Sequence, residues 1–205
     1  TVIKIKGYLN GVLDDEMHTT TAYITPKAPT ITWSSDFNNT FSVIDNNTGD
    51  TAAIYVTIDG TTPSASNTTD VRTITTAVGN VKAVAVRHGL TSSVASSSHT
   101  IKLATPTISW SARAATSGGG QVATITCSNI KGVTFYYTTD GTAPTTSSTS
   151  KTAGASSNSI TVDFGTAGTY TVKVFAVKKD YLNSAVFTDS ARTIYKLSAP
   201  TITKT

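Results

Sequence analysis

The chain has 205 residues, of which 38% are hydrophobic and only 14% charged, and its formal net charge is +4 at pH 7. An average globular domain has about 25% charged residues, so Ser and Thr hydroxyls must supply much of the polar surface here. The basic residues are scattered, with no run longer than Lys178-Lys179, whereas nucleic-acid-binding proteins cluster Lys and Arg on one face. No apolar run approaches the roughly 18 residues of a membrane-spanning helix. Composition therefore argues against nucleic-acid binding and membrane insertion.

The composition is that of an all-β protein. Thr is β-branched and suits strands, and Glu16 is the only Glu in a chain poor in helix formers. No apolar pattern with a 3.6-residue period extends over a useful length, so we expect no helices. Cys127 is the only cysteine, which excludes an intrachain disulfide and favours a bacterial or phage surface protein over a secreted eukaryotic domain. We expect it to be a small buried hydrophobic residue.

Residues 1–27 come first and resemble the end of a repeat. Residues 2–13, VIKIKGYLNGVL, resemble residues 174–187, and residues 18–31 resemble residues 97–108. We predict that the first 27 residues are the last strands of a preceding partial repeat, whose remainder lies upstream in a longer protein. The alternative is that they complete a sheet in another chain, because an open sheet edge invites pairing.

Two full repeats are expected to follow. APTITW at residues 28–33 recurs as TPTISW at residues 105–110, and the near copies AIYVTIDGTTP and TFYYTTDGTAP place Asp59 and Asp140 in equivalent turns. The strand-like segments keep their order while the connections vary in length, as in structural repeats. The predicted divisions are residues 28–103 and 104–197 for the two repeats and residues 198–205 for the start of a following repeat or a linker.

Each repeat is predicted to be an Ig-like or fibronectin-III-like antiparallel β-sandwich, because about seven short strands with turn signals between them are typical of that fold. Asp140-Gly141 predicts a type I′ hairpin. Pro144 should end the central pairing, since it has no N–H to donate, and the Ser/Thr run at 145–157 should be a loop or a ragged edge. The strands expected in the second repeat lie at 106–110, 121–129, 134–139, 158–164, 169–177 and 185–197.

Three stretches also resemble a known family. YYTTDGTAP (136–144), VKVFAVKKDYLNS (172–184) and SAPTI (198–202) resemble the Ig-like repeat at the C-terminus of chitobiases and related β-hexosaminidases, whose relatives recur in bacterial surface and carbohydrate-active proteins. Residues 55–63 match the same motif with two replacements, Val56 and Ile58. The catalytic residues of that family lie in a separate barrel domain, so the resemblance implies a non-catalytic accessory module.

The residues suggest no catalytic site, metal site or cofactor. Glycoside hydrolysis needs two carboxylates that face each other, and most of the acidic residues lie in expected turns or loops. His18, His88 and His99 lack the close spacing of metal ligands, so we expect them to be solvent-exposed. Residues 45–50, DNNTGD, resemble part of a calcium loop but lack its closing Glu and any counterpart in the other repeat. A plain hairpin loop is the favoured interpretation.

Four aromatic residues are candidates for stacking on sugar rings. Trp33 and Trp110 follow the Pro that opens each repeat, and packing in the core or between repeats is the favoured role because a Trp buries a large area. Tyr55 and Tyr136 are also equivalent, and each points away from its neighbours on its strand. The sequence does not say which of those two faces is the core.

Two functions stay open. The favoured one is a non-catalytic structural spacer made of tandem repeats in a longer bacterial or phage surface protein, such as an adhesin, fibre or virion protein. Its partners would be neighbouring repeats or subunits of the same assembly, outside the cell or on the virion. The alternative is a glycan-binding accessory module of a carbohydrate-active enzyme or phage fibre, with cell-surface glycans as ligands. The exposure of Trp33 and Trp110 discriminates between them.

Overall fold

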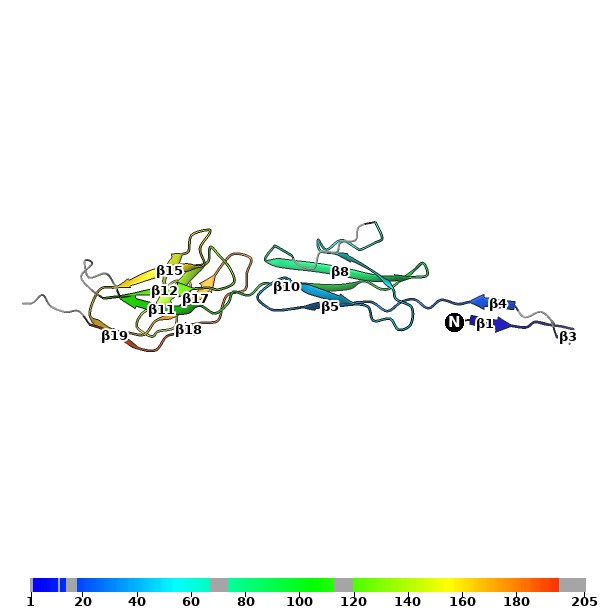
Figure 1. The fold of residues 1–205 in the computed structure, drawn as a ribbon, viewed down its shortest axis with the longest axis horizontal. Helices are drawn as coiled ribbons and strands as arrows, with labels where there is room; N and C mark the ends of the chain where they lie inside the picture. Colours follow the sequence, from blue (N-terminus) through cyan, green and yellow to red (C-terminus); the bar gives the residue numbers. More distant parts are fainter. Residues whose placement is uncertain (1, 11, 14–17, 67–73, 113–119, 196–205) are drawn as a thin grey trace, which may run out of the picture. The chain divides into compact units, whose positions relative to one another are not determined.

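The structure is a computed structural model that describes residues 2–10, 12–13, 18–66, 74–112 and 120–195 (Figure 1). Every regular element in these ranges is a β-strand, and the strands pair in antiparallel sheets. The described part holds no helix long and apolar enough to cross a membrane. The prediction of an all-β, Ig-like sandwich fold is confirmed.

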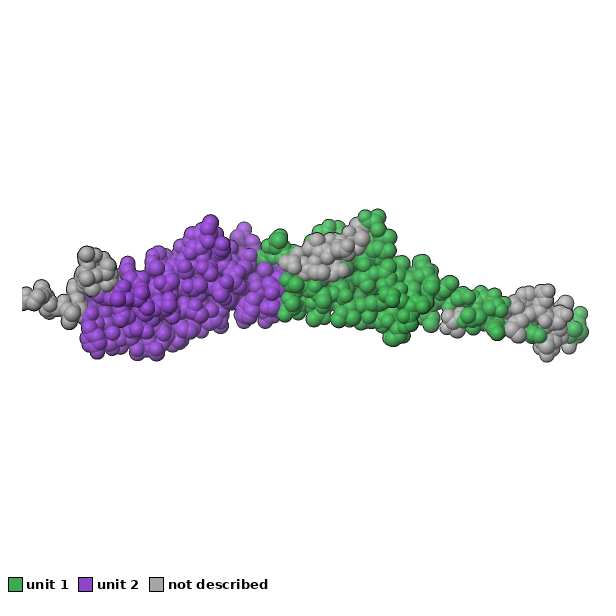
Figure 2. Space-filling model, in the orientation of Figure 1, with its two compact units in different colours: residues 1–34, 40–99 green, residues 35–39, 100–205 purple. Residues whose placement is uncertain are grey.

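The chain divides into two compact units, which Figure 2 shows in different colours. The first unit consists of Thr1–Ser34 and Thr40–His99, and the second of Ser35–Asn39 and Thr100–Thr205. The division after His99 lies four residues before the repeat boundary that we predicted after residue 103. The repeat boundaries themselves, including the partial repeats at both ends, stay predictions.

The first unit contains a sheet with the strand order β10-β8-β7, a β5-β6 pair, and two further short pairs, β1-β4 and β2-β3. β9 adds to the first of these sheets by pairing with β8. The strands are β1 (Val2–Ile5), β2 (Tyr8–Leu9), β3 (Val12–Leu13), β4 (His18–Thr21), β5 (Thr30–Trp33), β6 (Phe41–Ile44), β7 (Ala53–Thr57), β8 (Val78–Arg87), β9 (Leu90–Thr91) and β10 (Ala95–Thr100).

The second unit contains a three-stranded sheet, β11-β12-β15, a four-stranded sheet, β14-β13-β17-β18, and a β16-β19 pair. Short strands in antiparallel sheets that enclose one core are the architecture of Ig-like sandwiches. The strands are β11 (Thr107–Ala112), β12 (Gln121–Thr126), β13 (Thr134–Thr138), β14 (Thr149–Thr152), β15 (Ser159–Phe164), β16 (Gly168–Tyr170), β17 (Lys173–Val177), β18 (Phe187–Thr188) and β19 (Arg192–Ile194).

Each unit has its own hydrophobic core. Phe135 and Ile125 are buried at the centre of the second unit, and Cys127 packs with them as a fully buried free thiol, as predicted. Phe41 and Val56 are buried in the core of the first unit. Burying a side chain of this size contributes about 1.5–3 kcal/mol to stability, so these residues account for the alternating pattern of the strands.

The two equivalent tyrosines lie on the outer faces of their sheets. Phe135 is fully buried in the core and Tyr137 packs against the same core. Because side chains alternate along a strand, Tyr136 lies on the opposite face, where it is stacked on Phe175 at 5.6 Å between ring centroids. Tyr55 is placed in the same way, next to the buried Val56. The structure thus answers the question that the sequence left open about these strands.

The predicted type I′ hairpin at Asp140-Gly141 is wrong. That turn needs a positive φ at both central residues, and of these two only Gly141 has one, at 83°. The carboxylate of Asp140 instead accepts hydrogen bonds from the Thr142 N–H at 3.0 Å and the Thr142 hydroxyl at 2.6 Å. Asp side chains stabilise turns in this way. β13 and β14 therefore pair across a longer connection. The strand pair nearest to this connection is Tyr137 opposite Thr149.

The first unit does contain a two-residue turn in which both residues have a positive φ. His88 and Gly89 have φ values of 50° and 75° and join β8 to β9, with Arg87 opposite Leu90. This is the pattern that a type I′ hairpin requires. Asp180 in the second unit also has a positive φ, at 69°.

The strand predicted at residues 169–177 is in fact two strands in different sheets. β16 pairs with β19, whereas β17 pairs with β13. The break falls at Thr171, whose N–H donates to Thr139 O and whose carbonyl accepts from Gly141 N–H. The Asp-Gly turn therefore takes the backbone groups of Thr171 out of the sheet ladder and lets the chain change sheets.

Candidate functional site

Trp33 packs against the core of the first unit. Its ring lies 5.4 Å from the ring of Phe41 and is stacked at 5.0 Å on His99. Its indole N–H donates to Ser97 Oγ at 2.9 Å. The absence of a side chain at Gly79 leaves room for the ring, because a Cβ there would lie only 2.7 Å from the indole. The indole is half-buried and its polar atom already has a partner.

Trp110 is placed in a similar way in the second unit. Its ring lies 5.0 Å from that of Phe164, and the indole N–H donates to Asp189 Oδ2 at 2.6 Å. The guanidinium carbon of Arg192 lies 4.8 Å from the ring centroid, a distance at which a cation attracts the face of an aromatic ring. Arg192 therefore occupies a face that a sugar ring would need. A role of these tryptophans or of the tyrosines in glycan binding stays a prediction.

The three histidines differ in their surroundings. His88 is exposed, as predicted. The prediction of solvent exposure is wrong for His99, which is half-buried and stacked on Trp33, with its Nε2 buried and without a partner among the described residues. The side chain of His18 lies outside what the structure describes. No group of three or more His, Cys, Asp or Glu that could hold a metal ion occurs in the described part of the chain.

The 45–50 loop uses its first carboxylate to hold itself together. Asp45 accepts hydrogen bonds from the Asn47 side chain and N–H and from the Ala52 N–H. The Asn47 side chain is the largest cause that lowers the pKa of Asp45, and the backbone donors act in the same direction. A carboxylate that already binds these N–H groups serves the loop rather than a cation.

Asn47 and Asn129 hold the segments that precede β5 and β11, a role that the sequence did not reveal. In the first unit, Lys27 N–H donates to Asn47 Oδ1 at 2.7 Å and Asn47 Nδ2 donates to Lys27 O at 3.3 Å. In the second unit, Ala104 N–H donates to Asn129 Oδ1 at 3.0 Å and Asn129 Nδ2 donates to Lys102 O at 2.8 Å. We call this arrangement the asparagine clamp.

The asparagine clamp corrects the expectation that the 45–50 loop has no counterpart. Lys27 and Ala104 each precede a buried proline by two residues, at Pro29 and Pro106. The signal available in the sequence was therefore an Asn in the loop after β6 or β12 together with that proline. Asn is common in loops because it forms turns readily. An Asn that instead binds a distant segment is therefore hard to recognise from the sequence.

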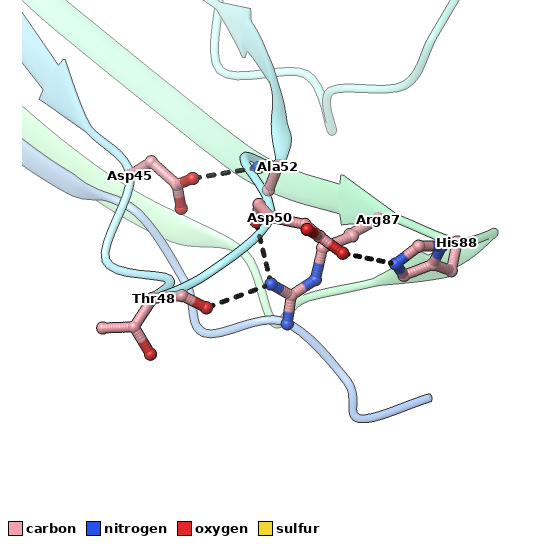
Figure 3. A network of polar contacts seen from close by, with 6 residues as sticks. All are labelled: Asp45, Thr48, Asp50, Ala52, Arg87 and His88. Atoms are coloured by element: carbon pink, nitrogen blue, oxygen red, sulfur yellow. Dashed lines mark hydrogen bonds and ion pairs between the residues drawn. The ribbon is translucent and has the colours of Figure 1, made fainter. Parts of the chain in front are cut away.

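A recess of about 380 Å³ lies beside the clamp of the first unit, lined by Thr21, Tyr23 and Ile24, by residues 48–50, and by Arg87 and His88. Figure 3 shows polar contacts among the lining residues, in which Arg87 donates to Asp50 O at 2.9 Å and to Thr48 O at 3.4 Å. The Nε2 atom of His88 lies 3.5 Å from Asp50 Oδ2, and the His88 ring is stacked at 4.2 Å on Tyr23. These groups suit recognition by hydrogen bonds and stacking.

Comparison with known proteins gives one match, which lies within the second unit. Residues 112–188 match the family model of the chitobiase/beta-hexosaminidase C-terminal domain. No curated protein sequence matches the chain. The match spans β12 to β18 and includes the YYTTDGTAP stretch at residues 136–144, which resembles the same family. This domain family is a non-catalytic accessory domain. Residues 112–188 are therefore similar to the chitobiase/beta-hexosaminidase C-terminal domain, which has an Ig-like fold.

Proposed function

We propose that the chain supplies non-catalytic spacer units, arranged as tandem Ig-like repeats, to a longer bacterial or phage surface protein outside the cell. Its partners are neighbouring repeats or subunits of the same assembly. The observation that supports this proposal best is the asparagine clamp, because it recurs in both units at the same distance from a buried proline. A family of non-catalytic accessory domains is compatible with such a role.

Holding a connecting segment in one conformation, as the asparagine clamp does, costs conformational entropy. Fixing the backbone of one residue costs about 1–2 kcal/mol of conformational entropy, and Asn129 holds both Lys102 and Ala104. Such bonds are useful where the direction of the segment matters. A spacer that must keep its units apart needs segments of this kind, whereas an independent binding module does not.

The placement of the two tryptophans supports the same proposal. Each indole N–H already donates to a side chain of its own unit, Ser97 for Trp33 and Asp189 for Trp110. Each ring also packs against a core aromatic residue. Sugar-binding aromatic residues need an open ring face, so these two contribute to stability in the proposed function.

The test is the backbone order of the segment that Asn129 holds. In the full chain, the heteronuclear NOE values of Lys102 and Leu103 should equal those of strand β12, and Asn129→Ala should lower them. The matched control is Asn47→Ala, which removes the clamp of the first unit and should leave Lys102 and Leu103 unchanged. A segment that is already flexible in the unmodified chain contradicts the spacer function.

A second candidate function is glycan binding, in an accessory module of a carbohydrate-active enzyme or phage fibre. The observation that favours it is the stacked pair of Tyr136 and Phe175 on the outer face of the β13–β17 sheet, together with the family match. A glycan array probed with the full chain and with Tyr136→Ala tests it. Binding that Tyr136→Ala abolishes would support glycan recognition, and the absence of any binding would leave the spacer function.

A further inference from the structure

The segments that precede β5 and β11 can be aligned on their prolines. Pro29 and Pro106 are both buried and both open a first strand, and counting back from them pairs Pro26 with Leu103, which are also both buried. The same count pairs Tyr23, Ile24 and Thr25 with Thr100, Ile101 and Lys102. The N–H donors of the two asparagine clamps agree with this alignment, because they pair Lys27 with Ala104. The carbonyl partners do not, since Asn47 donates to Lys27 O and Asn129 to Lys102 O.

In the second unit this segment is covered by a short loop. The second unit includes Ser35–Asn39, far from the rest of it in sequence. The Lys102 N–H donates to Asp36 O at 2.7 Å, and Asn129 Nδ2 donates to Phe37 O at 3.3 Å. Ile101 is only 7% exposed. The loop is therefore recognised through its backbone carbonyls, by one N–H of the segment and by the clamp asparagine.

The turn at Asp180 in the second unit also holds the segment at residues 101–103. Leu182 N–H donates to Ile101 O at 3.0 Å, and Leu103 N–H donates to Leu182 O at 2.9 Å. The first unit cannot make the second of these bonds, because Pro26 replaces Leu103 and has no N–H. Its turn instead approaches the segment through the stacked rings of Tyr23 and His88.

In the first unit the equivalent surface is open. Tyr23 is 52% and Ile24 is 69% exposed, and the recess of about 380 Å³ lies over them. The Thr25 N–H, the counterpart of Lys102 N–H, has no hydrogen-bond partner among the described residues. The donor and the apolar surface that take up the loop in the second unit are thus both available in the first.

We propose that the recess of the first unit is a docking site for a short polar loop of the Ser35–Asn39 kind, presented by another Ig-like unit. The loop places a backbone carbonyl on Thr25 N–H and covers Ile24, while Tyr23 and His88 form the side wall. The occupied segment of the second unit defines the partner, since it shows which peptide fits the same backbone. The proposal rests on the proposed tandem arrangement only for the source of the loop.

The test supplies the loop in the full chain. Residues 33–41 are added at the N-terminus through a short Gly/Ser linker, which places them near the recess because Val2 pairs with Thr21 at its rim. A short flexible linker gives an effective concentration of about a millimolar. Hydrogen exchange at Thr25 N–H should slow severalfold, and the amide signals of Ile24 and His88 should shift.

Two controls make the result decisive. A fusion with the same nine residues in scrambled order should leave Thr25 unprotected. Ile24→Asp, in the fusion with the native order, should abolish the protection without unfolding the chain, because this side chain is exposed. Equal exchange at Thr25 in the native-order and scrambled fusions would overturn the proposal. This outcome is distinct from a failure of the spacer function, which is measured at Lys102 and Leu103.

Discussion

Replacing Asn129 by Ala should destabilise the second unit by about 1–3 kcal/mol. The amide makes two good hydrogen bonds, at 3.0 Å with Ala104 N–H and at 2.8 Å with Lys102 O, and the net contribution of such a bond is about 0.5–1.5 kcal/mol. Its longer contacts, to Phe37 O at 3.3 Å and from Cys127 Sγ at 3.4 Å, add little to stability. Water can reach part of the freed backbone, which sets the lower end of the range.

The assay is urea unfolding followed by the fluorescence of Trp110, in a Trp33→Phe background so that only the second unit reports. The midpoint should fall while the dependence of the unfolding free energy on urea stays constant, as expected for a local loss of bonds. Ser128→Ala is the matched control, since this neighbouring side chain is exposed, and it should change stability by less than about 0.5 kcal/mol. If Asn129→Ala behaves like Ser128→Ala, the clamp contributes nothing and the argument for a held segment fails.

Three further predictions concern the second unit. Trp110→Phe removes the N–H that donates to Asp189 and should cost about 1–2 kcal/mol in urea unfolding followed by circular dichroism; an unchanged midpoint would show that this bond is dispensable. Cys127 is fully buried, and burial raises the pKa of its thiol, so a thiol reagent should label it only after urea unfolds the unit, and rapid labelling of the native chain would contradict that burial. The hydrogen bond from the Thr142 hydroxyl, followed by that from its N–H, holds the pKa of Asp140 below 3.8; because the folded pKa is the lower one, the stabilisation is present above 3.8 and is lost as the pH falls through the folded pKa. Thr142→Val should move the NMR titration of this carboxyl back toward 3.8, and an unmoved titration would refute the assigned cause.

The all-β fold could be predicted because alternation and turn residues act locally. Ile125 and Phe135 are buried in strands that the pattern indicated. The tyrosine faces could not be predicted, because Phe135, Tyr136 and Tyr137 are all aromatic and only the opposite sheet decides which of them is covered. The turn type at Asp140 was missed because the Asp side chain competes with the backbone for the Thr142 N–H, a contact that the dipeptide Asp-Gly does not reveal.

The site was harder to predict than the fold, for a physical reason. Trp33 and Trp110 are the obvious candidates for a sugar-binding site because they are large aromatic residues. Each, however, donates its indole N–H to a side chain of its own unit. Asn47 and Asn129 bind backbone groups of a segment that is distant in sequence. Because every residue has such backbone groups, the sequence does not show which residue is the partner. Only the buried prolines Pro29 and Pro106, at a constant distance from the clamped residue, show where to look.

The difference between the two incoming segments comes down to one residue. Leu103 fills the core and still donates its N–H to Leu182 O, so the second unit ties its segment to the neighbouring turn by backbone bonds. Pro26 also lies buried but has no N–H, so the first unit relies on the Tyr23–His88 stack. The Thr25 N–H has no hydrogen-bond partner in the part of the chain that the structure describes. Pro26 thus accounts for the missing backbone bond to the turn, whereas the counterpart of Thr25 N–H in the second unit, Lys102 N–H, bonds to Asp36 O of the loop.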